Sequence, residues 1–82
     1  FFRVTKWTIE PGGAIPMHRH DFEYVVIPLV NETMFAVNAD GSEIRADLTI
    51  GQSYTRAAGS EHRVENRGAE HTVAFVEVER LA

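Results

Sequence analysis

Turn-forming residues interrupt this chain at short intervals, which leaves no room for long secondary-structure elements. The interruptions fall at residues 11–13, 31–32, 40–41, 58–60 and 66–68. The runs between them are rich in Val, Ile, Phe, Tyr and Thr, and they occupy residues 3–10, 22–29, 33–38, 43–50, 52–56, 62–65 and 71–79. No segment keeps a helical spacing of apolar residues for long enough to form a stable helix. The pattern therefore predicts an all-β sandwich or barrel with little or no helix, in which 40–41 and 66–68 form hairpin turns.

The length of the chain predicts one small domain, covering residues 1–82. A domain of this size buries a modest share of its surface, so its stability is marginal unless something adds to it. The chain has no cysteine, which excludes disulfide bonds, thiolate nucleophiles and sulfur ligands for a metal. A bound metal or a dimer interface would supply the missing stabilisation.

The charge and hydropathy patterns exclude two classes of partner. The net charge is -4 and no basic stripe follows the chain, so nucleic acid is not an expected partner. The longest apolar run, residues 25–30, is too short to span a bilayer, so no membrane association is expected. A cytoplasmic location is the default expectation.

Two predicted strands are apolar on both faces, which indicates that a second layer covers each of them. They lie at residues 22–27 and 73–76. The N-terminal strand adds further apolar side chains, at Phe1, Phe2, Val4, Trp7 and Ile9. Because one small barrel does not easily cover this much apolar surface, we expect a homodimer built on the early strands.

Three histidines in two separated clusters suggest a metal site. His18 and His20 are two residues apart, so on an extended segment both side chains point to the same face. His62, brought alongside by a return strand, would complete a set of three imidazoles. Such a set suits a divalent transition metal, and the sequence does not choose among Fe, Ni, Zn, Cu and Mn.

The glycines around these histidines resemble the two sequence motifs of the cupin superfamily. The first motif matches at Gly12, His18 and His20, and the second at Gly51, Gly59, His62 and Asn66. The resemblance spans most of the chain and implies a single-domain cupin: a double-stranded β-helix, or jelly-roll barrel, with the site inside.

The sequence departs from the family pattern at the fourth metal ligand. The family places a Glu four residues after the second His of the pair, and here that position holds Tyr24. The family's closing Gly is replaced by Asn31, which also tolerates a left-handed backbone and so supports an ungapped alignment. Counting alternate residues from His20 puts Tyr24 on the ligand face and Glu23 on the opposite face, from which a β-bulge would have to re-aim it. We therefore expect three imidazole ligands, with Tyr24 beside the bound cofactor as a hydrogen-bonding or weakly coordinating group.

Three functions fit these features. The first is a binding module that holds a metal and a small carboxylated or hydroxylated ligand. The second is a non-haem dioxygenase with a three-histidine metal site, and the third is a vestigial barrel that serves only dimerisation. An enzyme needs an acid or base beside the metal, and the predicted inner face offers few titratable groups besides the histidines. The sequence therefore favours binding, or oxygen chemistry that needs no protein base.

Overall fold

The computed structural model describes residues 1–82 and consists of eight strands with no helix. The strands are β1 (Phe2–Ile9), β2 (Ala14–Arg19), β3 (Tyr24–Pro28), β4 (Thr33–Asn38), β5 (Glu43–Asp47), β6 (Tyr54–Arg56), β7 (Glu61–Glu65) and β8 (Val73–Arg80). They form two four-stranded sheets, with strand orders β1-β8-β3-β6 and β2-β7-β4-β5. All strand pairs are antiparallel. The predicted all-β jelly-roll barrel is confirmed. No helix is long and apolar enough to span a lipid bilayer.

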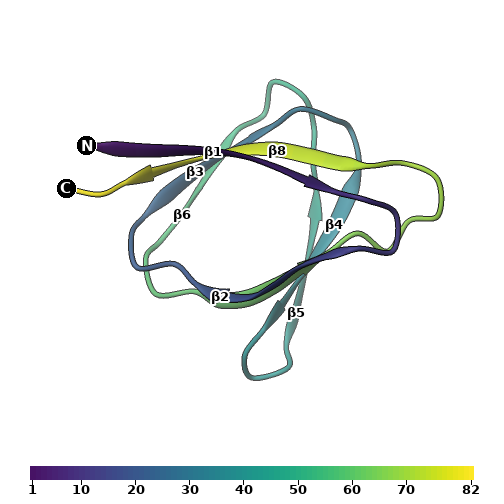
Figure 1. Cartoon of the computed structure of the whole chain (residues 1–82), viewed down its shortest axis with the longest axis horizontal. Helices are drawn as coiled ribbons and strands as arrows, with labels where there is room; N and C mark the ends of the chain where they lie inside the picture. Colours follow the sequence, from purple (N-terminus) through teal and green to yellow (C-terminus); the bar gives the residue numbers. More distant parts are fainter.

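The chain passes from one sheet to the other at almost every connection. Only β4 and β5 are both consecutive in sequence and paired with each other. The first and last strands pair along their whole length, which brings the two termini side by side (Figure 1). Because the remaining connections are crossovers, the two sheets face each other and enclose one interior.

The turns agree only in part with the sequence prediction. The Asp40-Gly41 hairpin is confirmed, with Gly41 at φ 89° between β4 and β5. The predicted hairpin at 66–68 is wrong, because the strands on either side of it belong to different sheets. The left-handed backbone expected at Asn31 is also absent, since every positive φ in the chain belongs to glycine. Asn31 instead stabilises its loop through its side chain, whose Oδ1 accepts a hydrogen bond from the Ile50 backbone N–H at 2.8 Å.

The β2 strand was missing from the predicted runs, and its composition explains why. Its six residues include Pro16, Met17 and His18, and only one β-branched residue, Ile15. Proline is compatible with an edge strand or a bulge, and β2 is both at the edge of its sheet and irregular between Ile15 and His18. A strand of this kind carries little of the residue pattern on which strand prediction depends.

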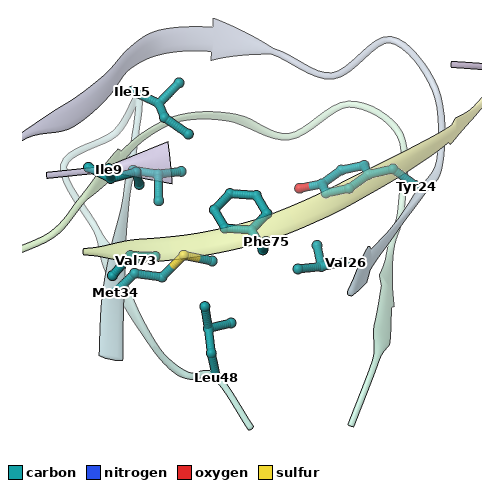
Figure 2. Close-up of a cluster of buried hydrophobic side chains, with 9 residues drawn as sticks. Ile9, Ile15, Tyr24, Val26, Met34, Leu48, Val73 and Phe75 are labelled. Carbon is teal, nitrogen blue, oxygen red and sulfur yellow. The ribbon is translucent and has the colours of Figure 1, made fainter. Parts of the chain in front are cut away.

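The two inner faces meet in one hydrophobic core beneath the histidines. Nine buried side chains form it: Ile9, Ile15, Tyr24, Val26, Met34, Leu48, Val64, Val73 and Phe75. Phe75 and Val73 on β8 are the most completely buried, and Figure 2 shows Phe75 near the centre of the cluster. The alternation that buries these side chains continues along β8, so the later inner-face residues of this strand also point to the interior.

Candidate metal centre

The three predicted metal ligands converge at the mouth of this interior. His18 lies on β2 and is paired across the sheet with His62 on β7, while His20 follows the end of β2. The Nε2 atom of His20 lies 2.9 Å from that of His18 and 3.1 Å from that of His62. One ligand atom from each of the three residues falls within 4.8 Å of the others.

The spacing of these nitrogens fits a shared metal ion. Metal–imidazole bonds of about 2.0–2.1 Å that meet at roughly a right angle place their two nitrogens about 3 Å apart. At 2.9 Å and 3.1 Å the nitrogens are also within hydrogen-bond distance of one another, and a bound metal ion would replace these contacts. The three side chains therefore have an arrangement that could hold a metal ion.

Backbone contacts fix the two histidines of the first cluster. The Nδ1–H of His18 donates to the carbonyl of Pro16 at 2.7 Å, which leaves Nε2 as the unprotonated nitrogen. The backbone of His20 is held on both sides, with its N–H donating to Ser60 O at 2.8 Å and its carbonyl accepting from Gly59 N–H at 2.7 Å. Gly59 makes this contact at φ 98°, a conformation that other residues rarely adopt.

The surroundings keep the buried histidines neutral. His20 and His62 are each 4% exposed. Burial, reinforced by His20, His18 and Arg56, lowers the pKa of His62 to about 4. Burial also lowers the pKa of His20. Because a metal binds the deprotonated imidazole, these two ligands are ready at neutral pH without losing a proton.

Tyr24 lies directly beside this cluster. Its ring stacks on the His20 imidazole, with 4.0 Å between centroids and an angle of 20° between the planes. Figure 2 shows the Tyr24 hydroxyl directed into the core, toward Phe75. Burial raises the pKa of this hydroxyl. Tyr24 thus packs against a ligand ring, and its role toward a bound cofactor stays a prediction.

The directions of Tyr24 and Glu23 do not come from a strand alternation that begins at His20, as the sequence had suggested. Residues 20–23 lie outside any strand, and β2 and β3 belong to different sheets, so no continuous alternation links His20 to Tyr24. The direction of Tyr24 comes from the alternation within β3 itself. Glu23 is exposed and pairs with Arg80 at 3.3 Å, so it lies outside the site. The β-bulge that would be needed to turn Glu23 toward the histidines is absent there. The register shift of the barrel edge lies in β2, between Ile15 and His18.

Two inward-facing carboxylates were missed by the sequence analysis. Glu77 and Glu79 on β8 are 6% and 8% exposed, so the expectation of few titratable groups on the inner face is wrong. The alternation that buries Val73 and Phe75 continues to Glu77 and Glu79. This continuation was the sequence signal that could have identified the two carboxylates as inward-facing. Arg3 on β1 binds Glu79 through two hydrogen bonds of 3.1 Å, which lowers the pKa of that carboxyl.

The two carboxylates share one cavity with His18 and His20. Its volume is about 380 Å³, at the lower end of the range for small-molecule sites. Residues of β1, β2 and β8 line it, among them Arg3, Trp7, His18, His20, Glu77 and Glu79. The site thus combines a histidine cluster that could hold a metal ion with an adjoining cavity large enough for a small ligand.

Two of the proteins similar to this chain are more than 30% identical to it and cover most of it. No family model matches the sequence. A beta-alanine degradation protein, BauB, from Pseudomonas aeruginosa is 45% identical over 76 residues, which are 93% of this chain and 78% of that protein. The crystal structure of a cupin domain from Bordetella pertussis is 38% identical, with a TM-score of 0.90 over 99% of this chain and 82% of that one.

A more distant structure shows the same fold. A Cupin 2 conserved barrel domain protein from Salinispora arenicola is 21% identical, with a TM-score of 0.73 over 99% of this chain and 64% of that one. The fold is therefore kept where most of the sequence has changed.

Proposed function

Since this chain belongs to the cupin superfamily, we propose that it holds one divalent transition-metal ion through His18, His20 and His62 and binds a small-molecule ligand at that ion. The observation that carries the proposal is the convergence of three Nε2 atoms, with neighbouring pairs 2.9 Å and 3.1 Å apart. A metal held by three imidazoles keeps open coordination positions and supplies a Lewis acid to an anionic or hydroxylated ligand.

Several features support a working site over a vestigial barrel. The hydrogen bond from His18 Nδ1 to Pro16 O has the form of the outer contacts that orient metal-bound histidines. The lowered pKa of His62, about 4, keeps its imidazole neutral and able to bind a metal at neutral pH. The adjoining cavity of about 380 Å³ gives a small ligand access to the cluster.

The relative from Pseudomonas aeruginosa suggests the size and class of the ligand. Its name assigns it to the degradation of β-alanine, a three-carbon amino carboxylate. We propose that the ligand of the present chain is likewise a small carboxylate. A carboxylate oxygen is a suitable ligand for the open positions of a divalent metal.

Metal analysis of protein purified without an affinity tag tests the metal site. We expect about one equivalent of a single transition metal per chain, or the same after reconstitution of stripped protein. Less than about a tenth of an equivalent, unchanged on reconstitution, would contradict the proposal and restore the vestigial barrel. Oxygen uptake by the Fe(II)-loaded protein with a small substrate would instead identify a three-histidine dioxygenase.

We also propose that the protein is a homodimer that covers the outer face of the β1-β8-β3-β6 sheet. This face carries Phe2 and Val4 of β1, which are 68% and 66% exposed, beside the outer side chains of β8 and β3. An apolar sheet face of this kind is typical of a surface that another subunit covers. Light scattering at micromolar concentration should give about twice the 9.2 kDa chain mass, and Val4→Glu should give the monomer. A monomeric wild type would contradict the dimer.

A further inference from the structure

Glu77 is a buried carboxylate that the proposed metal site does not use. It is 6% exposed and lines the cavity that contains His18 and His20. The cluster of ligand atoms within 4.8 Å includes three imidazoles and no carboxylate. Glu77 is therefore near the metal position but outside the set that would bind the ion.

Glu77 forms no ion pair with a side chain of the protein. Its neighbour on β8, Glu79, is neutralised by Arg3, whose guanidinium is engaged through Nε and one terminal nitrogen. No Lys, Arg or His nitrogen forms an ion pair with Glu77, whereas Glu79 has its pair at 3.1 Å. Burial raises the pKa of Glu77, as expected for a carboxyl without a counter-ion.

Trp7 adds a second unused group in the same cavity. Its Nε1–H is buried and has no partner at hydrogen-bond distance and angle, although it lies close enough to Glu77 to oppose the rise in pKa. Its indole lines the cavity wall on β1. An aromatic ring beside a carboxylate is a favourable environment for an ammonium group.

We propose that Glu77, with Trp7 beside it, binds the end of the ligand that faces away from the metal, and that this end is an ammonium group. The ligand class is then a short amino carboxylate, with the carboxylate at the metal and the ammonium at Glu77. A buried carboxylate is stabilised far more by a cation than by a neutral donor, which is why an amine fits better than a hydroxyl. The inference rests on the proposed function, because it takes the three histidines to hold the metal.

Binding of matched probes to the Ni(II)-loaded protein at pH 7 tests this inference by calorimetry. The probes are β-alanine, 3-hydroxypropionate and propionate, which differ only in the group at the far end. Wild type should bind β-alanine at least about tenfold more tightly than propionate, with 3-hydroxypropionate between them. Glu77→Gln should reduce the preference to about twofold or less and leave the metal content unchanged.

Controls separate this inference from the proposed function. Glu23→Gln removes an exposed carboxylate outside the cavity and should keep the full preference. Glu77→Gln removes an unbalanced buried charge, so its thermal stability should equal or exceed that of wild type, and Glu77→Leu provides a second neutral replacement. A preference that survives in both Glu77 variants would show that the amine coordinates the metal directly and would overturn the inference. Equal binding of all three probes by wild type would overturn the ammonium site at Glu77 and leave the proposed metal site standing. Absence of metal from the protein would overturn the proposed function.

Discussion

His62→Ala is expected to abolish stoichiometric metal binding. The change removes one of three converging nitrogens, and a site with two imidazoles on one face holds a divalent ion far less tightly. The loss of metal binding should also remove the stabilisation that bound metal gives. A ligand present at 100 times its dissociation constant stabilises the folded state by about 2.7 kcal/mol. In a domain of this size we expect added Ni(II) to raise the melting temperature of wild type by about 10 °C or more and to leave that of His62→Ala unchanged.

The matched control for this variant is Glu23→Gln. Glu23 is exposed and pairs with Arg80, so its loss should change neither the metal content nor the thermal shift. Elemental analysis and thermal unfolding, with and without metal, measure both quantities on the same samples. Full metal content in His62→Ala, or its loss in Glu23→Gln, would show that the ion is bound elsewhere.

The fold class could be predicted because it follows from local patterns. Short β-rich runs between turn residues exclude helices, and the motif glycines mark points where the backbone needs a positive φ, as at Gly12, Gly51 and Gly59. The strand order could not be predicted, because it depends on long-range pairing that no local pattern encodes. The turn at 66–68 illustrates this difference: its residues suit a hairpin, but β7 and β8 pair with partners far away in sequence.

The candidate site was predictable only where its residues carry a motif. The spacing of His18 and His20 places two imidazoles together whatever the rest of the fold, and the second motif adds His62. Glu77 and Glu79 belong to no motif, and their inward direction is visible only when the alternation of β8 is continued past its apolar half. Charged residues at the end of a strand are usually solvated. These two are exceptions because the inner face of β8 stays buried past its apolar half, where Arg3 pairs with Glu79.

Asn66→Ala is expected to be the most destabilising single change in the chain outside the hydrophobic core. Asn66 is 3% exposed, and its Nδ2 donates to the carbonyls of Ile9 at 2.9 Å and His71 at 2.8 Å. Its Oδ1 accepts from the Gly68 N–H at 3.0 Å. One side chain thus joins the end of β1, the loop after β7 and the approach to β8. Alanine would leave three backbone groups without partners, at a cost of about 3 kcal/mol or more in the free energy of unfolding.

Urea unfolding of the metal-free protein measures this cost, with Asn31→Ala as the control. Asn31 makes one exposed hydrogen bond, to the Ile50 N–H, so its loss should cost about 1 kcal/mol or less. Asn66→Asp keeps the acceptor for Gly68 but replaces the two donors with a buried negative charge facing two carbonyls, and it should be at least as destabilising as alanine. If Asn66→Ala and Asn31→Ala had similar unfolding midpoints, Asn66 would not be the link between the ends of the barrel strands. The asparagine that closes the second motif would then owe its place to something other than these three hydrogen bonds.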